Sequence, residues 1–101
     1  MNKSALDKII KKVVYPKYPY IVDHEIVVHS DNGDAGWGVE SSKMYVVDLY
    51  VGKKEIEGID MKELLNNMDK AEALVEHLFE LLGFNKNETI RVNYSLNENR
   101  K

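Results

Sequence analysis

Three histidines are the residues of this chain best suited to metal binding or acid–base catalysis. His24 and His29 lie five positions apart in a segment that alternates like a strand, so their side chains should point to opposite faces. His77 has Ala73 and Leu81 at helical spacing and therefore gains no second ligand on its own face. A small hydrolase would need a pocket that joins His24 or His29 to a carboxylate. We predict no metal, no cofactor and no catalytic residue.

Other ligand-binding motifs are incomplete. The acidic run over 31–34 is similar to the start of a calcium loop, but the twelfth position is Ser42 where an EF-hand needs an acid. The glycines over 36–38 lack the third glycine and the following helix of a dinucleotide fingerprint. The chain has no cysteine, which excludes disulfides and thiolate zinc sites.

One charged pattern remains. Glu72, Glu76 and Glu80 are each four positions apart in a segment with helical periodicity. Like charges at this spacing destabilise a helix by a few tenths of a kcal/mol per pair. Residues 18–60 add nine acids against three lysines, so the middle of the chain is acidic. This predicts a negative surface that fits a positive partner, and the alternative is an ordinary solvated helix face.

The charge balance also bears on partners and location. The net charge is −3 and the sequence pI is about 5.6, so direct binding of nucleic acid is not expected. Residues 1–17 are nevertheless basic, with five lysines and one acid. The first residues lack the apolar stretch of a signal peptide, and no apolar run reaches the ~20 residues of a membrane span. We expect a cytoplasmic protein of a bacterial host.

Exposed aromatic residues would be the apolar anchors of such an interface, because aromatic side chains contribute disproportionately to binding energy. Tyr18 and Tyr20 belong to a proline-stiffened connector, and Trp37 lies in a glycine-rich loop. The alternative for the tyrosines is that their rings cover the core. The predicted partner-binding residues are Glu72, Glu76, Glu80, Asp31, Asp34, Trp37, Tyr18 and Tyr20.

The elements that must position these residues form one domain over 1–101. An apolar stripe from Leu6 to Val14 predicts a first helix that ends at Pro16. Alternation predicts strands over 20–29, 39–51 and 89–96 and a short strand over 55–59. Asp60 with Glu63 predicts a short helical turn, Asp69 with Glu72 a second helix near 70–82, and Gly83 its end.

We therefore expect an α+β fold with a small three- to four-stranded, mostly antiparallel sheet. Two main helices should pack on one face of it. The strand over 89–96 alternates strictly between apolar and polar residues, which favours an antiparallel strand with one wet face.

The chain as a whole resembles small inhibitors of phages and mobile elements, notably those of the anti-CRISPR type. It is acidic, rich in lysine and asparagine, free of cysteine and about a hundred residues long. The features behind the resemblance are the acids from Asp23 to Asp60, the Glu72, Glu76 and Glu80 stripe and the tyrosine-rich connector. The resemblance implies a protein that occludes the guide-RNA or DNA surface of a CRISPR effector nuclease. The alternative is a non-catalytic structural or regulatory module of a low-GC bacterium or phage, homodimeric through a sheet edge or the leucine-rich helix.

Overall fold

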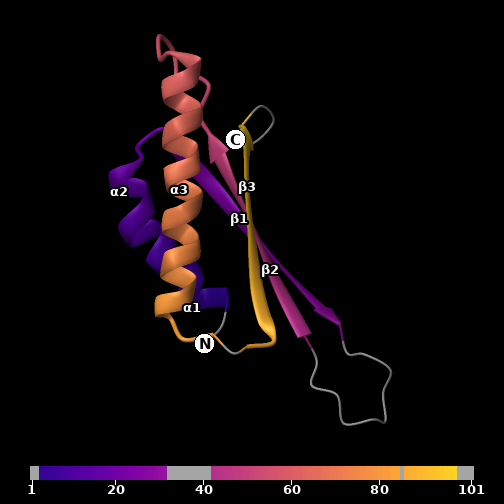
Figure 1. The fold of residues 1–101 in the computed structure, drawn as a ribbon. Coiled ribbons are helices and arrows are strands. Elements are labelled where there is room, and N and C mark those ends of the chain that lie inside the picture. The colour runs from indigo at the N-terminus through magenta and orange to yellow at the C-terminus, as the bar shows by residue number, and fades with distance from the viewer. Residues whose placement is uncertain (1–2, 32–41, 85, 98–101) are drawn as a thin grey trace, which may run out of the picture.

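The computed structural model describes residues 3–31, 42–84 and 86–97. Its elements, in chain order, are α1 (Lys3–Ile9), the π-helix η1 (Ile10–Val14), α2 (Tyr15–Lys17), β1 (Ile21–Asp31), β2 (Ser42–Val51), α3 (Met61–Leu81) and β3 (Glu88–Leu96). The first three elements follow one another without a break, so the chain has two main helical segments and a three-stranded sheet (Figure 1).

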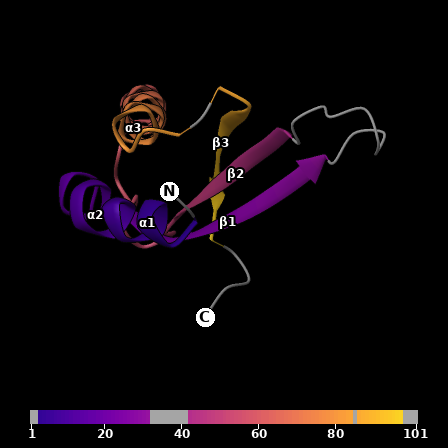
Figure 2. The same cartoon turned by 90° about the horizontal axis from the view of Figure 1, so that it is seen from below.

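Both helical segments lie on the same side of the sheet. Figure 2 looks along α3 and shows both helical segments on one side of the strands, with no described helix on the other. The core fills the space between these two layers. Its fully buried members include Leu6 and Ile10 from the first segment, Val47 and Leu49 from β2 and Val75 from α3. The predicted α+β class, with two main helices on one face, is confirmed.

The sheet is mixed, whereas a mostly antiparallel sheet was predicted. The strand order is β1-β2-β3, with β1 antiparallel and β3 parallel to the central strand β2. The long helix α3 carries the chain back to the starting end of β2, as a parallel crossover requires. Half-buried and exposed residues alternate in β3 because helices cover one face of the sheet and no described helix covers the other. The alternation therefore carries no information on the direction of the strand.

The first helical segment continues through Pro16, where the sequence predicted its end. Residues Ile10–Val14 form a π-helix, and the Tyr15 amide donates to the Ile10 carbonyl five residues back. A new α-helical turn starts directly after it, with Pro16 at one of its first two positions. A proline is tolerated in a first turn because its missing amide needs no partner there.

One helix replaces the predicted pair in the second half of the chain. The Asp60 carboxylate accepts from the Glu63 amide at 3.3 Å, which confirms the first start signal. The second signal, at Asp69, lies inside α3 because the buried stripe continues past it through Met68 and Ala71. Gly83 has φ +79° and ends the helix as predicted.

The predicted short strand over 55–59 is absent from the described chain. These residues form turns, with the Glu57 amide bonded to the Lys54 carbonyl and the Ile59 amide bonded to the Ile56 carbonyl. Gly58 has φ +79°, which interrupts an extended strand. The two isoleucines are half-buried against the core, which explains their apolar spacing.

None of the helices in the described part of the chain combines the length and hydrophobicity needed to cross a bilayer.

Candidate functional site

Acidic residues follow the side of α3 that faces β3. Asp69, Glu72, Glu76 and Glu80 rise along this side over about 16 Å, at 1.5 Å per residue. Burial, followed by the charges of Asp69 and Glu72, raises the pKa of Tyr94 of β3, so both acids lie near this tyrosine. Glu76 and Glu80 share a cavity with Glu88, the first residue of β3. We call these five carboxylates the acidic edge, and it brings together all three predicted glutamates.

In the described part of the chain, no lysine or arginine forms a salt bridge with Glu72, Glu76 or Glu80. Burial raises the pKa of Glu72, and the neighbouring charges of Asp69 and Glu76 raise it further. Asp69 and Glu76 are therefore close enough to Glu72 for their charges to act on it. Their field therefore reaches into solvent, where a cationic partner can respond to it.

A cavity of about 380 Å³ lies at one end of the acidic edge. Its lining includes three carboxylates, Glu76, Glu80 and Glu88, and two aromatic rings, Phe79 and Phe84. The two rings stack with centroids 4.1 Å apart and planes 9° apart. Carboxylates beside aromatic rings suit a guanidinium or an ammonium group, which gains from the negative charges.

The three glutamate side chains of this cavity differ in how firmly they are held in place. The Tyr45 hydroxyl donates to Glu88 Oε2 at 2.8 Å, and burial followed by this bond raises the pKa of Tyr45 to about 12. The hydrogen bond from Tyr45 therefore fixes the position of the Glu88 carboxylate. Glu76 and Glu80 are exposed and can adjust to a partner.

Acids from the middle of the chain lie on the uncovered face of the sheet, apart from the acidic edge. Glu25 and Asp48 are directly opposite each other on β1 and β2. Neutral donors reach both of them, because Asn93 donates to Asp48 at 3.2 Å and the Tyr50 hydroxyl points to Glu25 at 3.4 Å. Two carboxylates that lie opposite each other on neighbouring strands repel and destabilise a sheet. This pair forms a second negative patch, separate from the acidic edge.

The predicted aromatic anchors are not confirmed as a surface. Tyr18 is buried in the core and meets Tyr20 edge to face, with centroids 5.9 Å apart, so it cannot contact a partner. Tyr20 is half-buried. Its hydroxyl is buried and finds no hydrogen-bond partner among the described residues. Both rings cover the core beside the first helical segment, the alternative that their sequence left open.

Three other predicted partner-binding residues receive little or no description. Asp34 and Trp37 lie outside the described residues. Asp31 ends β1 opposite Ser42, and only its backbone is described.

A buried hydrogen-bonded cluster joins the first helical segment to β1, and the sequence did not predict it. His24 Nε2 is hydrogen-bonded to Asp7 Oδ1 at 2.6 Å, and its Nδ1 is hydrogen-bonded to the Tyr15 hydroxyl at 2.7 Å. Lys11 also contacts Asp7, at 3.4 Å. Asp7 and Tyr15 stand eight residues apart, about two helical turns, and this spacing was the available signal.

The cluster stabilises the fold and leaves little chemistry for a ligand. His24 does meet a carboxylate, as a hydrolase would require, but both ring nitrogens are occupied and the side chain is 2 % exposed. Burial raises the pKa of Tyr15 to about 12, with help from the charges of Asp23 and Asp7. Its hydroxyl is therefore a donor to the ring at neutral pH and does not act as an anionic nucleophile.

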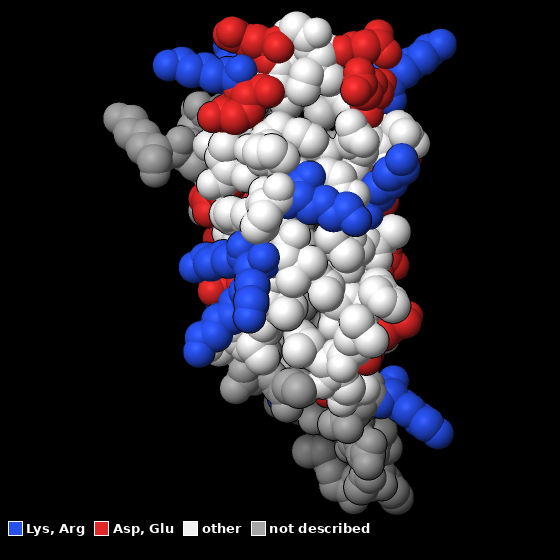
Figure 3. Space-filling view, turned by 90° about the vertical axis from the view of Figure 1, so that its left-hand side faces the viewer, with Lys and Arg blue, Asp and Glu red and all other residues white. Residues whose placement is uncertain are grey.

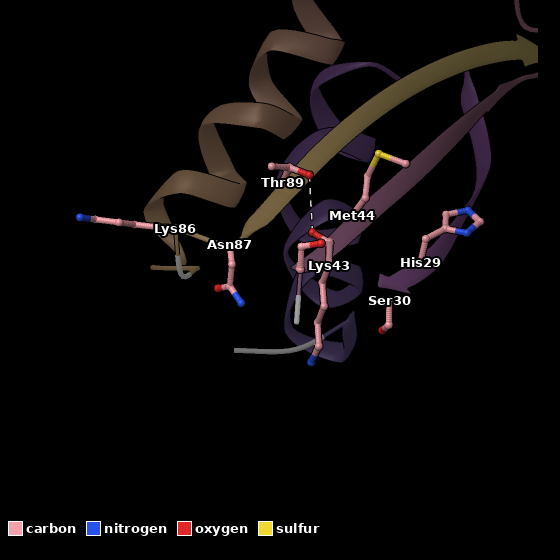
Figure 4. Close-up of a pocket in the computed structure, with 8 residues that line it drawn as sticks. His29, Ser30, Lys43, Met44, Lys86, Asn87 and Thr89 are labelled. Atoms are coloured by element: carbon pink, nitrogen blue, oxygen red, sulfur yellow. Dashed lines mark hydrogen bonds between the residues drawn. The ribbon is translucent and has the colours of Figure 1, made fainter. Parts of the chain in front are cut away.

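His29 lies on the uncovered face at the far end of the hairpin. It lines a cavity of about 500 Å³ together with Lys43, Lys86 and Asn87. Figure 4 shows the two lysines pointing away from each other and His29 pointing to a third side. The polar groups do not converge on a common point, so this cavity is a weaker candidate than the acidic edge.

The remaining lysines gather elsewhere. Lys8, Lys11 and Lys12 are exposed on the first helical segment. Figure 3 looks at the helix-covered side and shows lysine and arginine side chains at several places around a broad uncharged band, with acidic side chains near some of them. Among the described residues, none of these lysines forms a salt bridge with Glu72, Glu76 or Glu80.

Two further searches give no match. Among the described residues, no group of three or more histidines and acids is placed to hold a metal ion. Comparison with protein-family models, curated proteins and solved structures finds nothing similar to this chain. The acidic edge is therefore the strongest guide to function.

Proposed function

We propose that this protein is a non-enzymatic inhibitor that binds a nucleic-acid-handling protein and occludes the surface meant for guide RNA or DNA. The acidic edge is the observation that carries the proposal. Glu72, Glu76 and Glu80 are spaced along one side of α3, and no described lysine or arginine forms a salt bridge with them. A groove that holds phosphates is lined with lysine and arginine, and such a surface attracts this edge.

The aromatic cavity supports a protein partner over a nucleic acid. Three carboxylates around Phe79 and Phe84 would repel a phosphate backbone. The same arrangement accommodates a lysine or arginine side chain from the partner, with the charged head between Glu76 and Glu80. One inserted cation would fix the register of the whole edge along the groove.

The resemblance to anti-CRISPR inhibitors makes a CRISPR effector nuclease the partner class to test first. The protein would then act in the cytoplasm of the bacterial host. The exposed lysines of the first helical segment would lie away from the basic groove or against acidic parts of the partner. The interface would therefore depend on shape and on mixed charge.

The test is inhibition of target cleavage by purified effector nucleases of low-GC bacteria. We expect the wild-type protein to bind the nuclease before guide loading and to compete with guide RNA or target DNA. Charge reversal of the edge by Glu72→Lys, Glu76→Lys and Glu80→Lys should weaken binding by more than about a hundredfold, the upper range for removing several interface charges. The remaining binding should depend less on salt.

A matched control changes the net charge equally at other exposed acids. Glu25→Lys, Glu55→Lys and Glu57→Lys together should leave inhibition within about threefold of wild type, because charges outside an interface act mainly through association rate. Equal losses for both triple variants would show that only net charge matters. Binding unchanged by the edge variant would remove the acidic edge from the interface.

The second candidate is a homodimeric structural or regulatory module without catalysis. It is favoured by the sheet, in which β1 and β3 each pair only with β2 in the described chain. Long strands with a free edge tend to pair with another strand. Mass measurement by sedimentation in solution tests this, since a stable dimer at micromolar concentration with a continuous sheet supports the module, and a monomer supports the inhibitor.

A further inference from the structure

The buried residues of the first helical segment are spaced differently from those of α3. Between α1 and the residue after α2, the side chains that are at most 8 % exposed lie four positions apart, and they are Leu6, Ile10, Val14 and Tyr18. The buried side chains of α3 are separated by four and three positions in turn, as in the run Leu64, Met68, Ala71, Val75 and Leu78. An α-helix has about 3.6 residues per turn, so a constant spacing of four drifts by about 40° at each step. The first segment must therefore be wound more loosely than α3.

The looser winding is located in η1. The Tyr15 amide is bonded to the Ile10 carbonyl, five residues back. The ordinary α-helical spacing of four resumes directly afterwards, where the Tyr18 amide is bonded to the Val14 carbonyl at 2.9 Å. A π turn takes in about one residue more than an α turn and is rare in proteins. A local interaction must therefore hold this turn in place of a regular α turn.

His24 supplies that interaction, because it bonds to residues on both sides of the π turn. Its Nε2 is 2.6 Å from Asp7 Oδ1 and its Nδ1 is 2.7 Å from the Tyr15 hydroxyl. Eight residues of an α-helix turn through about 800°, which is about 80° past two full turns. In a regular α-helix Asp7 and Tyr15 would therefore point in different directions. The extra residue in η1 places both side chains on one face, where a single imidazole can bond to both.

The apolar residues of the segment also fit a regular α-helix. Ile9 and Val13 are half-buried beside the fully buried Leu6, Ile10 and Val14. On an α-helix these five side chains would occupy an arc of about 140°, a suitable width for a helix that packs on a core. Hydrophobic burial therefore does not choose between the π turn and an α turn, and the choice is left to the two bonds of His24.

We propose that the first helical segment has two registers and that its hydrogen bonds to His24 select the π register. Without these bonds η1 becomes α-helical, and residues 3–9 turn by about 80° relative to Tyr15. The rotation moves Asp7 away from β1 and carries the exposed Lys3 and Lys8 to a different side of the molecule. The inference goes beyond the inhibitor proposal, because it concerns the other helical segment and does not depend on the acidic edge.

NMR couplings through hydrogen bonds test the proposal, because they identify the carbonyl that accepts from each amide. In the wild-type protein we expect the Tyr15 amide to couple to the Ile10 carbonyl. The variant Asp7→Ala, Tyr15→Phe, His24→Leu removes all three polar partners together, so it leaves no buried polar group of the cluster unpaired. In this variant the amide at position 15 should couple to the Lys11 carbonyl, four residues back.

Lys11→Ala is the control for the loss of the Asp7 charge. It removes the contact between Lys11 and Asp7 at 3.4 Å but leaves both bonds of His24. The coupling between the Tyr15 amide and the Ile10 carbonyl should therefore be retained.

A matched pair of deletions tests the extra residue. Deletion of the exposed Lys12 leaves seven residues from Asp7 to Tyr15, within about 20° of two α turns, so a regular α-helix keeps both bonds to His24. The urea midpoint should change little. Deletion of Lys70, an exposed lysine of α3, turns one half of a regular helix by about 100° and moves its buried residues off the core. Cooperative unfolding should then be lost.

Three results would overturn the inference. They are a wild-type coupling from the Tyr15 amide to the Lys11 carbonyl, a retained coupling to the Ile10 carbonyl in the triple variant, and a loss of stability on deletion of Lys12 as large as that on deletion of Lys70. If the triple variant does not fold, the deletions still decide. Charge reversal at Glu72, Glu76 and Glu80 should leave the wild-type coupling unchanged, so failure of the inhibitor proposal is distinguished from failure of this one.

Discussion

Charged residues have opposite environments on the two sides of the helical layer. On the first-helix side, Asp7 bonds to His24 and contacts Lys11, so its charge is used to attach the helix to β1. On the α3–β3 side, Glu72 and Glu76 have no basic partner in the described chain and repel each other. The comparison separates charges that hold this fold together from charges that no described lysine or arginine balances.

Apolar residues show the same contrast. On the first-helix side, Leu6, Ile10 and Val14 are fully buried. At the start of α3, Met61 and Leu65 are largely exposed although they belong to the same amphipathic pattern. The apolar side chains of the first helical segment are taken up by the core. In contrast, α3 keeps exposed surface at both ends of its contact with β3.

The largest expected effect comes from the buried cluster. His24→Ala should lower the free energy of unfolding by about 3 kcal/mol, because it leaves Asp7 and the Tyr15 hydroxyl without their partner and opens a cavity. His29→Ala is the control on the same strand, exposed on the other face, and should cost less than about 0.5 kcal/mol. Urea unfolding measures both, and similar losses would mean that the cluster does not attach the helix.

The next prediction compares two tyrosine hydroxyls. On the α3–β3 side the Tyr45 hydroxyl is bonded to Glu88, whereas on the first-helix side the Tyr20 hydroxyl has no partner among the described residues. Tyr45→Phe removes the donor to Glu88 and should cost about 1.5 kcal/mol. Tyr20→Phe removes a buried hydroxyl that has no partner among the described residues and should stabilise the protein by about 1 kcal/mol. Thermal unfolding gives both signs. A destabilised Tyr20→Phe variant would show that its hydroxyl is satisfied in solution.

Local patterns in the sequence predicted most of the elements. The alternation over 20–29 and 89–96 places strands that the structure has at Ile21–Asp31 and Glu88–Leu96. The direction of β3 was wrong because alternation reports which face is wet and carries no information on the neighbour's direction. The break expected at Asp69 was wrong because continued burial of Met68 and Ala71 outweighs a capping signal inside a helix.

The candidate site was predicted in part. The glutamate stripe follows from helical spacing alone, so Glu72, Glu76 and Glu80 were found. Their closeness to Glu88 and Phe84 depends on the turn after α3, and the link from Asp7 to His24 depends on where a helix docks on a strand. Such contacts join distant parts of the chain, and no single segment encodes them.

A smaller effect follows from neutralising the edge. Glu72→Gln, Glu76→Gln and Glu80→Gln together should raise the free energy of unfolding by about 0.5 kcal/mol, since two repulsive pairs at i, i+4 are removed. The gain should shrink at high salt, where surface charges are screened. Denaturant unfolding at low and high salt measures it. A loss of stability would show that these acids have cationic partners after all, and the contrast between the two sides would fail.

The smallest effect is a difference in pH dependence between the two sides. Burial acts to raise the pKa of Asp7, but the hydrogen bond and charge of His24, followed by those of Lys11, outweigh it and lower the pKa below 3.8. The unfolded chain therefore binds more protons than the folded chain just below 3.8. Stability contributed by Asp7 is present above that pH and is lost as the pH falls through the folded pKa.

Glu72 has the opposite sign. Burial and the charges of Asp69 and Glu76 raise its pKa above 4.5, so the folded chain binds more protons than the unfolded chain just above that value. Stability therefore falls as the pH rises through this window. Urea unfolding from about pH 2 to about pH 7 should show that Asp7→Asn removes the loss below 3.8 and Glu72→Gln removes the decline above 4.5. Identical pH profiles for the two variants would mean that the two carboxylates share one environment, and the division between structural and available charge would be lost.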